Sequence, residues 1–146
     1  MSDLDRFVAA QDAGGTYDQA LTELRAGRKT SHWMWFVFPQ LAGLGRSETA
    51  RRYAVQGLEE ARAYLAHPVL GDRLRECTRA LLDDGSTDAV AVLGAVDAVK
   101  LRSCATLFAH AAAGTPDAAL FEEVLRRFYG DEPDATTIRV LWSTSS

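Results

Sequence analysis

Cysteine is scarce in this chain of 146 residues, which contains only Cys77 and Cys104. Both lie among apolar residues at helical spacing, where a free cysteine behaves as a small hydrophobic side chain. We therefore expect no disulfide framework. Long apolar runs are missing as well, since none approaches the ~20 residues that a membrane-spanning helix needs. This absence argues against a membrane-embedded protein and favours a soluble globular one.

Positive charge is also in short supply. The formal net charge is −4 and the pI is about 5.3, so the chain lacks the basic field that drives binding to nucleic acids. The densest cationic cluster, Arg46, Arg51 and Arg52, is interrupted by Glu48 and is typical of a solvated helix face. No nucleic-acid partner is expected. The first residues lack the basic and apolar regions of a secretory signal, which predicts a cytoplasmic location.

Recognisable metal-binding motifs are absent from the sequence. Its histidines, His32, His67 and His110, are widely separated, no H-E-x-x-H occurs, and the two cysteines are far apart. We expect neither a metal nor another cofactor. Fixed-period repeats, low-complexity tracts and linkers are absent too, which predicts one domain spanning residues 1–146.

Helical periodicity is the dominant pattern that the sequence does contain. Apolar residues recur at i, i+3, i+4 and i+7 in the segments 4–11, 17–24, 58–65, 70–81, 97–113 and 121–128. Residues 33–38 would alternate in a strand but have no partner strand, so a short buried helix is expected there. Residues 136–146 are compatible with strand or helix because β-branched residues are common. We predict an all-α fold, a compact single domain of about six or seven helices.

Capping residues mark several helix boundaries. Thr16 and Gln19 match a capping box at the start of the second helix, and Gly27 suits a left-handed stop at its end. Pro68 stops or kinks the helix that precedes it. Ser47 is either a plain N-cap or one corner of an anion pocket, since it follows the glycines of GLGRSETA.

The segment GRKTSHWMWFVFPQLAGLGRSETARRY, residues 27–53, has an apolar block with polar residues at both ends. Met34, Phe36 and Phe38 are predicted core residues. Pockets commonly combine an apolar wall with a few convergent polar groups, and indoles can stack on planar ligands. We predict a small-molecule pocket lined by residues that flank or belong to this block: Lys29, Trp33, Trp35, Gln40 and Ser47.

This segment, together with YLAHPVLGDRL and DAVKLRSCATLF downstream, resembles a bacterial family of uncharacterised small helical proteins that genome annotation often labels calpastatin. The resemblance covers most of the chain and implies a compact, mostly helical domain with no established activity. Calpastatin inhibitory regions are disordered segments that fold on their target, whereas this chain is patterned to bury its own core. We therefore expect no calpastatin function.

Three residues are candidates for catalysis. His32 lies three positions after Lys29 and could act as a general acid or base, or could simply occupy the first turn of a helix. Lys100 and Ser103 form a second pair, in which a deprotonated lysine could activate the hydroxyl. The simpler explanation for Lys100 is a helix ion pair with Asp97.

These residues favour an anionic, partly planar ligand such as a nucleotide, because positive groups and aromatic faces coincide. If the site is catalytic, hydrolysis or group transfer assisted by His32 is the expected chemistry. The alternative is a non-catalytic helical module that binds another protein. The sequence does not decide the oligomeric state.

Overall fold

The computed structural model describes residues 4–44 and 47–143, and their regular secondary structure is helical. The helices are α1 Asp5–Asp12, α2 Thr16–Arg25, α3 Met34–Val37, α4 Glu48–Arg52, α5 Leu58–Ala66, α6 Leu70–Asp83, α7 Ala89–Leu93, α8 Ala95–Ala111, α9 Asp117–Tyr129 and α10 Ala135–Ser143, with a 3-10 turn η1 at Ala13–Gly15. The predicted all-α fold is confirmed. There are more helices than the six or seven expected, because α3, α4 and α7 are too short to produce a clear periodicity.

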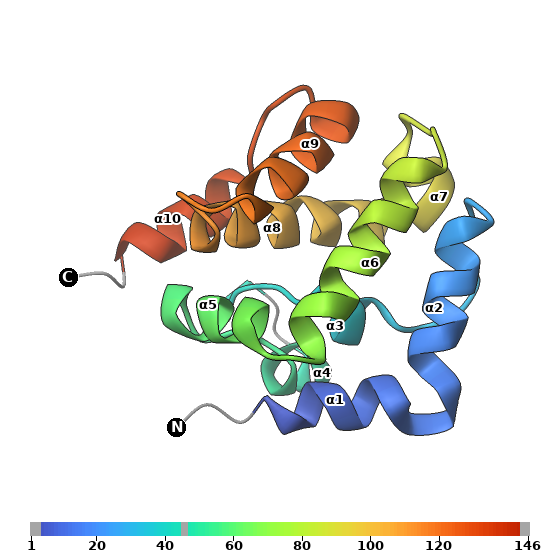
Figure 1. Cartoon of the computed structure of the whole chain (residues 1–146). Helices are drawn as coiled ribbons and strands as arrows, with labels where there is room; N and C mark the ends of the chain where they lie inside the picture. Colours follow the sequence, from blue (N-terminus) through green and yellow to red (C-terminus); the bar gives the residue numbers. More distant parts are fainter. Residues whose placement is uncertain (1–3, 45–46, 144–146) are drawn as a thin grey trace.

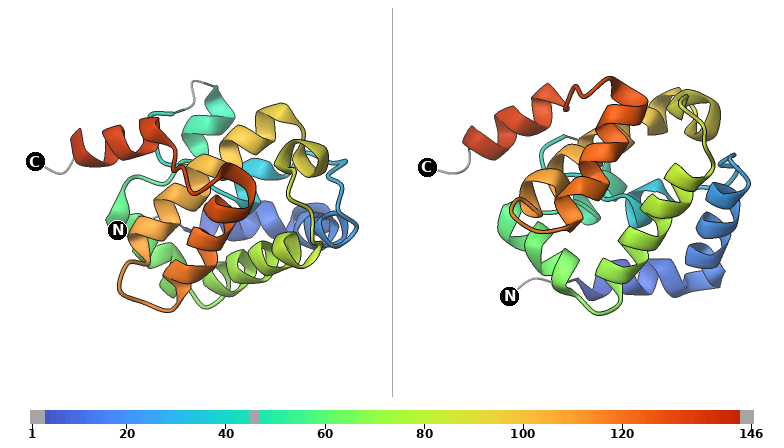
Figure 2. Two further views of the ribbon diagram at one scale, coloured as in Figure 1. Left: turned by 90° about the horizontal axis from the view of Figure 1, so that it is seen from above. Right: turned by 45° about the horizontal axis from the view of Figure 1, so that its top comes forward.

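Helix α8 is the central element of the fold. It packs against α5, α7, α9 and α10, while α6 packs against α2, α5 and α9 (Figure 1). Helices α1 and α2 meet at an angle at one end of the molecule, and the turned views place α2 beside α6 (Figure 2). Among the described residues the β-type pairing is a single parallel bridge between Leu41 and Val55.

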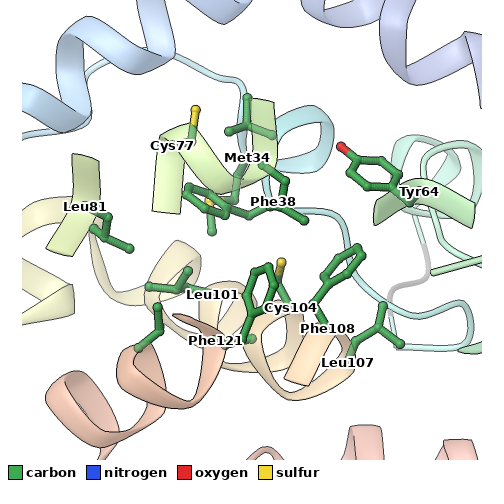
Figure 3. Close-up of a cluster of buried hydrophobic side chains, with 14 of the residues drawn as sticks. Met34, Phe38, Tyr64, Cys77, Leu81, Leu101, Cys104, Leu107, Phe108 and Phe121 are labelled. Carbon is green, nitrogen blue, oxygen red and sulfur yellow. The ribbon is translucent and has the colours of Figure 1, made fainter. Parts of the chain in front are cut away.

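The core lies between α8 and the helices that surround it (Figure 3). The ring of Phe108 lies 5.4 Å from that of Tyr64 and 5.6 Å from that of Phe121, measured between centroids. Cys77 and Cys104 are both free and buried in this core, as predicted. The apolar stripe predicted for residues 70–81 is buried at each of its positions, Leu70, Leu74, Cys77 and Leu81.

The helix boundaries agree with the sequence in part. Gly27 has a φ of 76°, the left-handed conformation predicted at the end of α2. Ser47 caps α4, since its hydroxyl accepts a hydrogen bond from the amide of Ala50. The capping box at Thr16 and Gln19 is wrong: the Thr16 hydroxyl donates to the Ala13 carbonyl at 2.7 Å. Helix α2 continues directly from η1, so Thr16 is already inside the helix.

The C-terminal segment forms a helix despite its β-branched residues. Asp134 precedes α10, and its carboxylate accepts hydrogen bonds from the amide and the hydroxyl of Thr137 at 2.8 and 2.7 Å. This cap offsets the weak helix propensity of the segment. Residues 144–146 lie outside the described part of the chain. Among the helices that the structure describes, none has both the length and the apolar character needed to cross a bilayer.

Candidate functional site

A buried carboxylate at the end of α2 holds the polar part of residues 27–53 in place. Glu23 Oε1 accepts hydrogen bonds from the amides of Thr30 and Ser31 at 2.7 and 2.9 Å, and from Trp33 Nε1 at 2.9 Å. Glu23 Oε2 accepts from the hydroxyl of Ser31 at 2.6 Å and from Gln19 Nε2 at 2.8 Å. Five donors therefore converge on one side chain and set the path of the chain between α2 and α3.

These hydrogen bonds keep Glu23 ionised. Burial by itself would raise the pKa of this carboxyl, but hydrogen bonds from Ser31, Gln19, Thr30 and Trp33 stabilise the anion and lower the pKa well below its usual value. No lysine, arginine or histidine of the described residues forms an ion pair with Glu23. The anion is thus compensated by neutral donors alone.

Both lysines of the sequence converge on Asp97 in the first turn of α8. Lys29 Nζ lies 2.7 Å from Asp97 Oδ2, and Lys100 Nζ lies 3.1 Å from Asp97 Oδ1. The amide of Lys29 also donates to the Val92 carbonyl at 2.7 Å, which ties the loop to α7. Burial alone would raise the pKa of Asp97, but the hydrogen bonds from Lys29 and Lys100 outweigh it, so that the pKa is lowered. We call Lys29, Asp97 and Lys100 the lysine cluster.

The indoles of Trp33 and Trp35 border the lysine cluster in different ways. Lys29 Nζ lies 5.1 Å from the ring centre of Trp33, which is 1% exposed and belongs to the core. Trp33 therefore presents almost no face on which a planar ligand could stack. Trp35 is only partly buried, and Lys100 Nζ lies 4.0 Å from its ring centre. This is a cation–π arrangement. Of the two indoles, that of Trp35 is the more exposed.

His32 is exposed and lines a separate pocket of about 260 Å³. The residues that line it come from the α1–α2 corner and from the loop before α3: Gly14, Thr16, Gln19, Ser31, His32 and Trp33. Neither lysine belongs to this lining. His32 was predicted to line one ligand pocket together with Lys29. The pocket that His32 lines contains neither Lys29 nor Lys100.

The other predicted site residues have individual roles. Ser103 is buried, and its hydroxyl donates to the Val99 carbonyl at 3.3 Å, one turn earlier in α8. Ser47 is the cap of α4, while Gly45 and Arg46 lie outside the described residues. Gln40 is 8% exposed, and its backbone carbonyl accepts from the Val55 amide at 2.8 Å. The structure describes no side-chain hydrogen bond for Gln40.

The sequence alone did not identify Glu23, nor the ion pair of Asp97 with Lys29. A signal for Glu23 exists, because it lies three residues after Ala20 and next to Leu24, on the edge of the apolar face of α2. A carboxylate there must find donors. The ion pair between Asp97 and Lys100 is the one predicted from their spacing. The pairing of Asp97 with Lys29 carries no local signal, since the two are far apart in the chain.

Within the part of the chain that the structure describes, no group of three or more His, Cys, Asp or Glu side chains could hold a metal ion. Burial raises the pKa of the Cys77 thiol to about 12, so the thiol is protonated at neutral pH. As far as the structure describes it, the segment 27–53 contributes to the lysine cluster and to the His32 pocket.

Comparison with known proteins identifies the family. A family model described as "Protein of unknown function (DUF1810)" matches residues 1–141. The chain belongs to this family. This DUF1810 protein is similar to the conserved hypothetical protein Rv1873 from Mycobacterium tuberculosis, for which a crystal structure is known. The two are 46% identical in sequence, the match covers 96% of each chain, and the TM-score is 0.89. No protein with a curated description matches the chain. The family resemblance inferred from the sequence motifs is therefore confirmed.

Proposed function

We propose that the lysine cluster and Trp35 form the recognition end of a binding site for an anionic, partly planar small molecule such as a nucleotide. The observation that carries the proposal is that two ammonium groups share a single carboxylate beside a partly exposed indole. Two positive charges and one negative charge leave a net charge of one at the cluster. An anionic group of a ligand would balance it.

The hydrogen-bonding capacity of the lysines supports the same conclusion. Each ammonium group carries three N–H donors, and the ion pairs with Asp97 engage one side of each group. The remaining donors need water or a ligand as acceptor. Phosphate and carboxylate oxygens are strong acceptors, and charge-assisted hydrogen bonds of this kind contribute about 1.5–3 kcal/mol each. The partly exposed indole of Trp35 is suited to stacking on a heteroaromatic ring.

Binding is better supported than catalysis. Hydrolysis or group transfer assisted by His32 requires its imidazole within hydrogen-bond reach of the bound ligand. His32 lines a pocket that contains neither lysine, and the Ser103 hydroxyl is buried and bonded to the backbone. Lys100 Nζ forms an ion pair with Asp97, and the Ser103 hydroxyl donates to the Val99 carbonyl, so the two side chains are not hydrogen-bonded to each other as a lysine-activated hydroxyl requires.

The test is a titration with AMP, adenosine and inorganic phosphate, followed by tryptophan fluorescence. We expect AMP to bind more tightly than either of its parts, because it engages the ammonium groups and the indole together. Lys100→Met should weaken AMP binding about tenfold, or ~1.4 kcal/mol, whereas Lys100→Arg should retain part of it. The matched control is Arg51→Met, which removes a positive charge from an exposed position on α4 and should leave binding unchanged.

A second measurement uses the fact that Lys29 and Lys100 are the two lysines of the sequence. Labelling with an amine-reactive reagent, read by peptide mass spectrometry, should modify Lys100 faster than the more buried Lys29. Bound AMP should slow the labelling of Lys100. If AMP neither quenches fluorescence saturably nor protects Lys100, the proposed nucleotide site does not exist.

The second candidate is a non-catalytic module that binds another protein. Val96 and Val99, 70% and 62% exposed, lie three residues apart on α8 next to the lysine cluster, and Val90 of α7 is also exposed. Exposed apolar side chains that lie together are typical of protein interfaces. This candidate predicts that the double variant Val96→Ser, Val99→Ser no longer associates with another protein chain, as measured by sedimentation. Its AMP titration should not change.

A further inference from the structure

The pocket beside His32 is walled by side chains whose hydrogens point away from it. The Ser31 hydroxyl and Gln19 Nε2 donate to Glu23, and the Thr16 hydroxyl donates to the Ala13 carbonyl. A hydroxyl has one hydrogen and two lone pairs, and an amide oxygen only accepts. With these hydrogens engaged by inner partners, the oxygen lone pairs of Thr16, Gln19 and Ser31 remain as acceptors for a ligand, and Gln19 retains one further N–H.

The buried charge behind the pocket has the same preference. Glu23 is ionised, is compensated only by neutral donors, and is bonded by three of the lining residues: Gln19, Ser31 and Trp33. Glu23 itself is buried, so solvent screens its field only weakly. The pocket therefore combines acceptor oxygens on its wall with a buried carboxylate directly behind three of its lining residues.

Among the described groups near the pocket, two positive contributions oppose this field, and each has a carboxylate of its own beside it. The N-terminus of α2 carries about half a positive charge, but Asp18 in its first turn carries a full negative one. Lys29 lies over the ring of Trp33, but its charge is paired with Asp97.

We propose that this pocket binds a small organic cation that carries a primary ammonium group. An ammonium offers three N–H donors and one positive charge, which complement the lone pairs of Thr16, Gln19 and Ser31 and the charge of Glu23. A volume of about 260 Å³ accommodates a short alkylammonium ion. This site is independent of the anion site at the lysine cluster, so either proposal can fail without the other.

The test is an NMR titration of the full chain with n-propylammonium at constant ionic strength, following the Trp33 indole N–H and the His32 ring protons. We expect saturable shifts of both. Propionate and n-propanol have the same carbon skeleton but lack the cation, and should produce no saturable shift. A response to propionate equal to that of propylammonium would overturn the assignment, as would the absence of any saturable response.

Two variants with the same added charge separate the pocket from general electrostatics. Gln19→Lys places an ammonium group within the pocket wall and should abolish the saturable shifts. Ala119→Lys adds the same charge at an exposed position on α9 and should leave them intact. Both substitutions are at exposed helix positions, where folding tolerates lysine. Equal loss in both variants, or persistence in Gln19→Lys, would refute the pocket as the binding site.

Discussion

At the scale of the residue, one buried carboxylate determines how the loop before α3 is held. Glu23 accepts five hydrogen bonds and has no cationic partner among the described residues. Hydrogen bonds to charged groups are stronger than those between neutral groups, and leaving their donors unsatisfied after burial is costly. Replacement of Glu23 should therefore destabilise the loop before α3 more than replacement of any single residue that donates to it.

We predict that Glu23→Gln lowers the free energy of unfolding by about 3 kcal/mol. The amide offers one acceptor oxygen in place of two and brings two hydrogens against donors that already point inward. Urea denaturation followed by circular dichroism measures the change. Glu122→Gln, the same substitution at an exposed position of α9, should stay within ~0.5 kcal/mol of the wild type.

The same variant should respond differently to acid. The pKa of Glu23 is lowered in the folded state, so its contribution is complete above the unfolded pKa of about 4.3 and is lost as the pH falls toward the folded pKa. Below about pH 4, the free energy of unfolding of the wild type should fall by up to ~1.4 kcal/mol more per pH unit than that of Glu23→Gln. Equal slopes in the two proteins would contradict this account.

The candidate site was only partly predictable at this scale. The sequence predicted Lys29, Lys100 and Trp35 as candidate site residues, and the structure places the two lysines at Asp97 and Lys100 over the Trp35 ring. Their role in a site stays a prediction. His32 was grouped with Lys29 from their spacing, but the loop between them is not helical, so they do not share a helix face. Spacing is informative only when the secondary structure that converts it into direction is known.

At the scale of the element, the turn between α5 and α6 depends on close approach of the backbone. The imidazole of His67 caps α6, since its Nδ1 accepts from the amides of Val69 and Leu70 at 3.1 and 3.2 Å. Gly71 packs against the end of α5 so tightly that a Cβ atom would overlap the carbonyl oxygen of Leu65. The sequence indicates a stop at Pro68 but gives no sign of this contact.

Gly71→Ala should therefore destabilise the protein, although the same change within a helix ordinarily stabilises it by about 0.5–1 kcal/mol. We expect a loss of about 2–3 kcal/mol, the usual range for overpacking a rigid contact. Thermal and urea denaturation measure the effect. The sign of the change in stability is decisive. An increase would mean that α5 and α6 do not approach each other as closely as the contact of Gly71 with the Leu65 carbonyl requires.

At the scale of the whole molecule, α8 connects parts of the chain that are distant in sequence. It contacts α5, α7, α9 and α10, and its buried residues join one continuous apolar cluster with those of α1, α2 and α6. Elements that share a core depend on one another for burial of their apolar faces. Loss of any one of them exposes surface on the others.

We predict that the chain unfolds as one cooperative unit, in line with a single domain over residues 1–146. Far-UV circular dichroism, which reports helix content, and tryptophan fluorescence should give coincident urea transitions. Trp33 reports on the core near α2, whereas Trp142 reports on α10 at the other end. Separate transitions for the two signals, resolved with Trp33→Phe and Trp142→Phe, would indicate two units.

The sequence by itself determined the helical class of this protein, its apolar stripes and the positions of glycine stops such as Gly27, because these follow from contacts within a few residues. Tertiary structure alone decided that Lys29 and Lys100 meet at Asp97, that Trp33 is buried while Trp35 is partly exposed, and that His32 lines a pocket that contains neither lysine. The reason is physical: local spacing sets the face on which a side chain lies, but which faces meet depends on how all helices pack around α8.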